Sequence, residues 1–121
     1  RIDHGVQAIH DAALMQRLAQ DRIPLTVCPL SNLKLCVYPS LAQHSLHRML
    51  EAGIVATVNS DDPAYFGGYL NENFIQTFAA LPLSAVHAYQ LARNSFEASF
   101  IGAPERSAHV ARLDALFESF A

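Results

Sequence analysis

The sequence predicts an α/β fold in which about three parallel strands are connected by helices. Short β-branched runs alternate with segments of helical periodicity, which is the pattern of parallel strand–helix–strand units. The run at 54–59 is apolar throughout, as strands buried on both faces are. Three such strands leave sheet edges open and faces partly covered. We therefore expect residues 1–121 to form a single partial domain.

The first predicted strand covers residues 1–4, and Gly5 directly after it permits a sharp turn. Asp11 is a suitable N-cap for a helix that continues to about Asp21, because the apolar residues that follow share one face. Pro24 then ends this helix.

The middle of the chain contains the second and third predicted strands. A β-branched run bounded by prolines predicts the second strand at 25–28, and residues 29–40 are predicted to be a long connection. Helical spacing returns at 41–52 and stops at Gly53, a residue type that commonly ends helices. The third strand follows at 54–59.

Three further helices are predicted in the second half of the chain, and the last of them has a clear apolar stripe. They cover residues 70–81, 84–100 and 105–120.

Composition and charge exclude several classes of protein. Lys plus Arg is 8 and Asp plus Glu is 11, so the formal net charge is −3, without the basic excess of nucleic-acid-binding proteins. No apolar stretch approaches the roughly 20 residues needed to cross a membrane. Two cysteines, Cys28 and Cys36, make a poor disulfide framework, so we expect a reduced, cytoplasmic location.

Polar residues at the ends of the predicted strands form the candidate site. His4, residues 28–32 and the pair Asp61 and Asp62 all fall where parallel strands meet their loops. Two adjacent carboxylates repel each other unless one meets a cation or keeps its proton. Successive strand residues also point in opposite directions, so the pair can serve two partners, such as a metal ion and a substrate nitrogen.

Each of these residues also has a structural interpretation. Asp61 or Asp62, followed by Pro63, can simply cap the next segment. A histidine at a strand end is more often a structural hydrogen-bonding group than a catalyst, although an imidazole beside a metal is well suited to proton transfer.

The remaining histidines and cysteines give weaker signals. His44 and His47 lie three apart on a predicted helix and can share a metal, but neither is at a strand end. Cys28 is expected to be a small buried apolar residue, and the spacing to Cys36 is no zinc signature. Surface or interhelix positions are expected for the other three histidines, which are His10, His87 and His109.

Three motifs together resemble the adenosine/adenine deaminase family of zinc aminohydrolases. They are R-I-D-H-G at 1–5, C-P-L-S-N at 28–32 and N-S-D-D-P at 59–63, and the resemblance continues into residues 94–100. Their order and spacing match the last three strands of the family's (β/α)8 barrel. The resemblance therefore implies that this chain is the C-terminal portion of a TIM-type barrel.

The resemblance also implies a reaction and a role for each strand-end residue. Asp61 resembles the zinc ligand, His4 the histidine that orients the attacking water, and Asp62 the residue that hydrogen-bonds a purine ring nitrogen. Zinc lowers the pKa of a bound water to about 7, so that hydroxide is available at neutral pH. To donate to a ring nitrogen Asp62 needs a proton, which the negative charge of Asp61 favours.

The resemblance favours the free base adenine as the substrate of the parent enzyme, which would deaminate adenine to hypoxanthine and ammonia in purine salvage. The nucleoside branch of the family usually has Gly where this chain has Asp3. If His4 points into the barrel, strand alternation makes Asp3 point away from it. The alternatives are adenosine deaminase, a barrel relative that has lost zinc, and an independent small α/β interaction module.

Several parts of the family's site have no counterpart in this sequence. The family also uses a His-x-His pair, a third histidine and a proton-donating glutamate, all of which precede the matched region. One carboxylate cannot hold a catalytic zinc, which takes about three protein ligands. We therefore expect the remaining Zn²⁺ ligands upstream, and an active enzyme only when the rest of the barrel is present.

Overall fold

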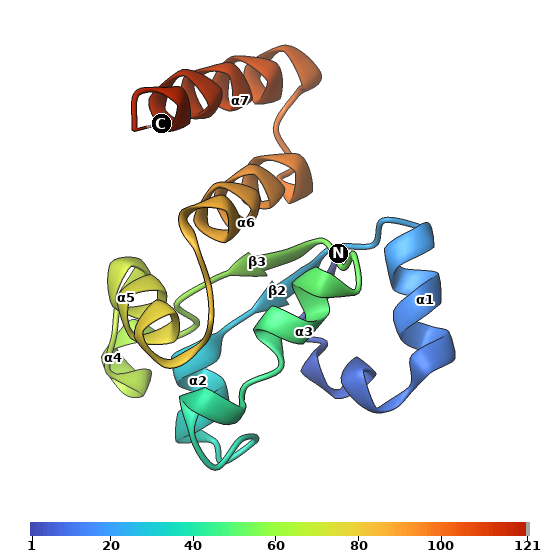
Figure 1. Cartoon of the computed structure of the whole chain (residues 1–121), viewed down its shortest axis with the longest axis vertical. Helices are drawn as coiled ribbons and strands as arrows, with labels where there is room; N and C mark the ends of the chain where they lie inside the picture. The colour runs from blue at the N-terminus through green and yellow to red at the C-terminus, as the bar shows by residue number, and fades with distance from the viewer. Residues whose placement is uncertain (121) are drawn as a thin grey trace.

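The structure is a computed structural model that describes residues 1–120, and a three-stranded parallel sheet lies at its centre (Figure 1). The strands β1 (Ile2–Asp3), β2 (Leu25–Val27) and β3 (Ala56–Val58) are hydrogen-bonded in the order β1-β2-β3. In the register, Asp3 pairs with Thr26, and Thr26 pairs with Thr57. The prediction of three parallel strands is confirmed, and each strand is shorter than predicted.

Helices cover one face of this sheet and lie beyond the ends of its strands (Figure 1). The 3₁₀ helices are η1 (Val6–His10) and η2 (Leu41–Gln43). The α-helices are α1 (Ala12–Gln20), α2 (Pro29–Lys34), α3 (Leu46–Glu51), α4 (Pro63–Phe66), α5 (Leu70–Ala80), α6 (Ala85–Ala98) and α7 (Ala103–Glu118). None of the helices in the described part of the chain is both long and apolar enough to cross a membrane.

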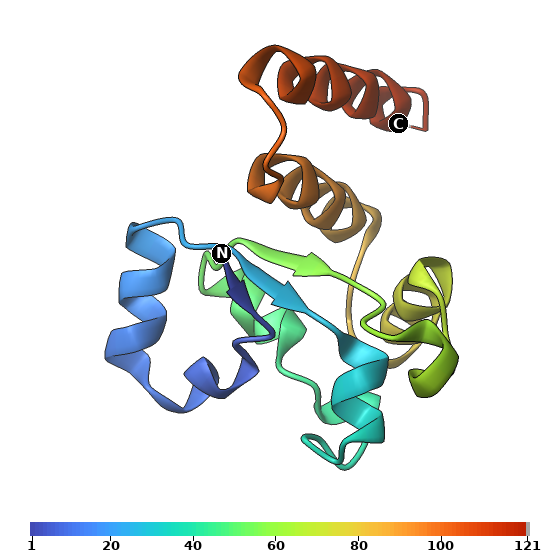
Figure 2. The ribbon, with the colours of Figure 1, turned by 180° about the vertical axis from the view of Figure 1, so that it is seen from behind.

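The two faces of the sheet have different surroundings. Leu25 and Val27 of β2 and Ala56 and Val58 of β3 belong to a buried core that also includes residues of α1, α3 and α6. Figure 2 views the sheet from the opposite side, where no helix in residues 1–120 lies in front of the strands. In a closed (β/α)8 barrel the helices form the outer ring, so this open face corresponds to the barrel interior.

Two of the predicted helix starts are confirmed in detail. Asp11 accepts a hydrogen bond from the backbone N–H of Leu14 at 3.0 Å and caps α1. Ser84 caps α6, and the side chain of His87 accepts from the backbone N–H of Ser84 at 3.0 Å. Such reciprocal caps satisfy backbone donors that would otherwise lack a partner.

Some predicted boundaries are wrong. Residues 29–40 were expected to be a connection, yet Pro29 starts α2, since proline's fixed φ suits the first turn of a helix. The single helix expected at 41–52 is divided into η2 and α3. His44 interrupts it in an extended conformation, with its Nδ1 accepting from the N–H of Leu46 at 3.0 Å.

Candidate active site

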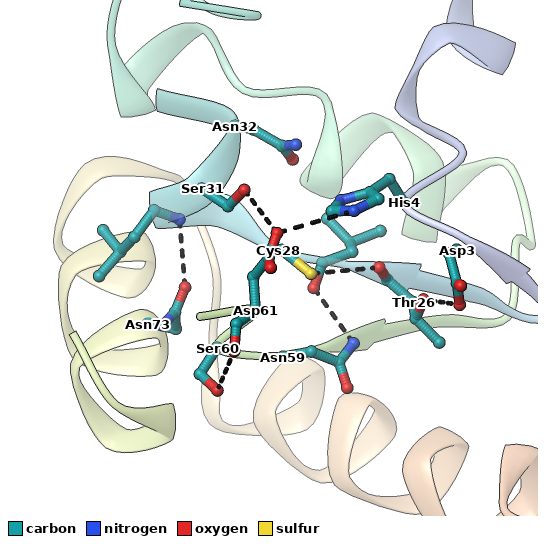
Figure 3. A network of polar contacts seen from close by, with 12 residues as sticks. Asp3, His4, Thr26, Cys28, Ser31, Asn32, Asn59, Ser60, Asp61 and Asn73 are labelled. Carbon is teal, nitrogen blue, oxygen red and sulfur yellow. Dashed lines mark hydrogen bonds and ion pairs between the residues drawn. The ribbon is translucent and has the colours of Figure 1, made fainter. Parts of the chain in front are cut away.

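The ends of the three strands bring together the residues on which the sequence-based prediction rests. Figure 3 shows His4 after β1, Cys28 after β2 and Asp61 beyond β3 grouped around one point. One ligand atom from each residue lies within 4.8 Å of the others. Side chains far apart in the sequence thus converge at the carboxyl edge of the sheet.

The carboxylate of Asp61 is held by two neighbours. The hydroxyl of Ser31 donates to Asp61 Oδ2 at 2.7 Å, and His4 Nε2 lies 3.7 Å from the same oxygen (Figure 3). Ser31 is fully buried, and the side chain of Asp61 is 28% exposed. The other oxygen, Oδ1, therefore remains available to a further partner.

Backbone strain sets the direction of both His4 and Asp61. Each has a φ of +58°, in the left-handed backbone region that residues other than glycine rarely adopt. Strain of this kind tends to occur at functional sites, where surrounding contacts hold it. Gly5, directly after His4, has a φ of +74°, and a Cβ at this position would lie 2.7 Å from Leu25 Cδ2, so the turn after His4 requires glycine.

Asp61 and Asp62 have different partners, as predicted, but strand alternation is not the reason. β3 ends at Val58, and the positive φ of Asp61 turns its side chain toward His4 and Ser31. Asp62 caps α4, because its Oδ1 accepts from the backbone N–H of Tyr65 at 3.2 Å. The capping interpretation therefore holds for Asp62, and its Oδ2 is left for another contact.

The alternation argument also fails for Asp3. β1 ends at Asp3, and the left-handed φ of His4 breaks the alternation at that residue. Asp3 accepts a hydrogen bond from Thr26 Oγ1 at 3.1 Å, between two residues that pair in the sheet (Figure 3). Thr26 alternates with the core residues Leu25 and Val27, so Asp3 lies with it on the open face of the sheet.

Cys28 is buried, as predicted, and it also lies near the carboxylates of Asp61 and Asp3. Burial first, and then the negative charges of Asp61 and Asp3, raise the pKa of the Cys28 thiol to about 11. The group therefore stays protonated at neutral pH. Both cysteines in the described residues are free.

Sequence reasoning missed the residues that support the site. Ser31 lies within the motif at 28–32, yet nothing local indicates that its hydroxyl meets Asp61 across 30 residues of chain. Asn73 is another example: its Oδ1 accepts from the N–H of Leu30 at 3.1 Å, joining α5 to α2 (Figure 3). Spacing gives no signal for either contact, because both depend on how α2 packs.

The prediction that His44 and His47 can share a metal is not supported by the geometry. His44 is buried, its Nε2 meets Asn32 Oδ1 at 3.0 Å, and burial lowers its pKa to about 4. His47 lies on α3 and faces Glu51 instead. The other three histidines lie in or beside helices, as expected: His10, His87 and His109.

An open cavity of about 390 Å³ lies beside His4. Gly5 and Val6 line one side of it, and Asn32 and Val37 line another. This volume falls within the range of small-molecule sites, about 300–1,000 Å³.

The donors at this site suit a zinc ion. The carboxylate of Asp61 is an ordinary zinc ligand, and His4 Nε2, 3.7 Å from its Oδ2, lies close enough to reach a water bound to the same ion. The Ser31 hydroxyl supplies the outer hydrogen bond that orients ligating carboxylates. Among the described residues, these side chains provide only part of the usual ligand set.

Comparisons with known proteins agree with this geometry. A sequence model of the adenosine deaminase family matches residues 1–116. An adenine deaminase from Albidiferax ferrireducens is 70% identical over 120 residues, which are 99% of this chain and 35% of that protein. The chain thus spans about a third of the length of this relative.

Solved structures of related proteins also match the fold of this chain. The crystal structure of an adenine deaminase from Arthrobacter aurescens has a TM-score of 0.94 and 42% identity, over 98% of this chain and 36% of the other. An amidohydrolase from Burkholderia ambifaria, with bound Zn, has a TM-score of 0.88 at 22% identity, over 98% of this chain and 34% of the other. The first match confirms that the three strands correspond to the C-terminal part of a (β/α)8 barrel enzyme.

Proposed function

This chain belongs to the adenosine deaminase family, and we propose that it forms part of a zinc-dependent enzyme that hydrolyses adenine to hypoxanthine and ammonia. The observation that carries the proposal is the convergence of His4, Ser31 and Asp61 at the carboxyl edge of the sheet. The high identity to an adenine deaminase over nearly the whole chain supports adenine as the substrate.

We assign Asp61 to zinc and His4 to proton transfer. Asp61 has one oxygen fixed by Ser31 and one free, so it can bind a cation without losing its orientation. Zinc, when bound, would lower the pKa of the water that attacks the purine. His4 Nε2 points toward Asp61 Oδ2, where it can take a proton from that water and return it to the leaving ammonia.

Asp62 is assigned to the purine ring. Its Oδ1 is occupied by the N–H of Tyr65, so the contact to a ring nitrogen falls to Oδ2. A ring nitrogen with a lone pair requires a donor, and the carboxyl supplies one only while it is protonated.

The overall reaction adds water and releases ammonia at C6 of adenine. The remaining zinc ligands and the residue that protonates the ring are assigned to a part of the enzyme outside residues 1–121. We accordingly propose that these residues belong to one barrel domain and are inactive alone. Purine salvage is the proposed setting of this reaction. We propose the cytoplasm as its location, because free cysteines are typical of a reducing compartment.

Assays of the full-length protein test the substrate assignment. Initial rates with adenine and with adenosine, measured on enzyme of known zinc content, should give a kcat/KM for adenine that is higher by at least about 100-fold. A higher kcat/KM for adenosine would show that the nucleoside, and not adenine, is the substrate. Absence of deamination together with absence of bound zinc would identify a non-catalytic relative of the barrel.

A further inference from the structure

A second group of potential metal ligands lies on the outer side of the sheet, away from the proposed active site. His47 and Glu51 are four residues apart on α3, and His87 reaches them from the first turn of α6. Glu51 Oε1 lies 3.8 Å from His47 Nε2 and 3.5 Å from His87 Nε2. One ligand atom of each residue lies within 4.8 Å of the others.

The two separations between Glu51 and the histidines are close to those of an occupied zinc site. Tetrahedral zinc with bonds of about 2.0–2.2 Å places its ligand atoms about 3.4 Å apart. The observed separations of 3.5 and 3.8 Å exceed this by only a few tenths of an ångström. The Glu51 side chain is 63% exposed and free to move by that amount, whereas His47 and His87 are 29% and 19% exposed and better fixed.

The orientation of the His87 ring is set by a second contact. The backbone N–H of Ser84 donates to His87 Nδ1, and the hydroxyl of Ser84 lies 3.0 Å from the same atom. A metal on Nε2 displaces the proton from that nitrogen, and the ring then carries its proton on Nδ1. Ser84 Oγ can accept a hydrogen bond from this N–H, as the outer partners of metal-bound histidines do. Binding therefore adds a hydrogen bond from Nδ1 to the Ser84 hydroxyl, and the Ser84 backbone N–H gives up its bond to Nδ1.

We propose that His47, Glu51 and His87 form a second zinc site that bridges α3 and α6. Two imidazoles and one carboxylate suit a borderline divalent cation, and water fills the remaining position. α3 precedes β3 and α6 packs directly on it. The three ligands are all within this chain, so the site is independent of the proposed adenine chemistry.

Another histidine–carboxylate pair provides a matched control. His109 Nε2 lies 3.9 Å from Glu105 Oε1, again four residues apart on one helix, with exposures similar to those of His47 and Glu51. Among the described residues, no third ligand joins this pair. The comparison isolates the contribution of the histidine supplied by the second helix.

Zinc titration of the full-length protein tests the proposal. Protein carrying one equivalent of zinc is titrated with further Zn²⁺ by calorimetry, alongside the variants His47→Asn, His87→Asn and His109→Asn. Asparagine at 87 keeps an acceptor where Nδ1 meets the Ser84 N–H and removes Nε2, so the helix cap is preserved. We expect micromolar binding of a second zinc, weakened more than about tenfold in the first two variants and unchanged in the third.

A thermal readout accompanies the titration. Excess zinc should raise the melting temperature of the wild type and of His109→Asn, because a ligand that binds only the folded state stabilises it. The His87→Asn variant should show no such rise. If the protein that already carries one zinc binds no second zinc, or if second-site binding survives in both His47→Asn and His87→Asn, the proposal is overturned. Loss of adenine deamination in the wild type would instead overturn only the proposed function.

Discussion

The hydroxyl of Ser31 donates a 2.7 Å hydrogen bond to Asp61 Oδ2, and it joins the start of α2 to the loop that follows β3. Ser31 has no exposed surface, so this bond is shielded from water. A hydrogen bond to a charged group contributes about 1.5–3 kcal/mol, and losing it leaves a buried group without its partner. Ser31 is therefore a positioning residue for the proposed zinc ligand.

We predict that Ser31→Ala weakens zinc binding by about 10–100-fold, as the loss of an outer-shell partner usually does. Zinc affinity is measured by competition with a chelator in the full-length protein. Ser45→Ala is the matched control, because Ser45 is equally buried but bonds to Tyr38, away from the site. Equal zinc affinity in the wild type and Ser31→Ala would show that Ser31 does not position Asp61 for zinc.

Asp61→Ala should lose zinc and activity together, since Asp61 supplies the proposed ligand oxygen. Zinc content is measured by elemental analysis of the purified full-length protein, and deamination of adenine by loss of substrate absorbance. If this variant kept its full zinc content, the ligand assignment would be wrong.

Asp62→Ala should keep zinc but lower kcat/KM for adenine by about 10–100-fold, because it leaves a ring nitrogen without its hydrogen-bond partner in the closed site. Because Asp62 also caps α4, a second variant separates the two effects. Asp62→Ser restores a good N-cap but is too short to reach a purine. Both variants should therefore be equally impaired, and recovery of activity in Asp62→Ser would show that the cap alone matters.

His44 makes folding stability depend on pH. Burial lowers its pKa to about 4 from the ordinary value of 6.5, so the unfolded chain takes up a proton first as the pH falls. The stability contributed by neutral His44 is present above pH 6.5 and is lost as the pH falls toward 4. Between pH 7 and 5 the wild type should lose about 2 kcal/mol more than His44→Gln in urea unfolding of the full-length protein. Equal losses would contradict the assignment.

Gly5→Ala should destabilise the protein more than Gly67→Ala. Both glycines have a positive φ, of +74° and +82°, so both variants bear a similar backbone cost. Only the Gly5 variant also places its Cβ 2.7 Å from Leu25 Cδ2, whereas nothing lies within 4 Å at Gly67. We expect a difference of about 1–3 kcal/mol in the free energy of unfolding. Similar values would show that Leu25 moves aside easily.

The sequence by itself determined the fold class, the order of the strands and the family. The apolar run at 54–59, the alternation with helical segments and the three motifs are local patterns, which can be recognised without knowing how distant parts of the chain pack. The N-caps at Asp11 and Ser84 were predictable for the same reason, since a cap involves residues only a few positions apart.

Only the tertiary structure decided where the side chains at the strand ends point. His4 and Asp61 have a positive φ where the chain leaves β1 and β3, so strand alternation could not predict the direction of their side chains. The contact between Ser31 and Asp61 joins residues 30 apart, and that between Glu51 and His87 joins residues 36 apart. Such contacts form only when separate elements pack together, so the periodicity of a single segment cannot predict them.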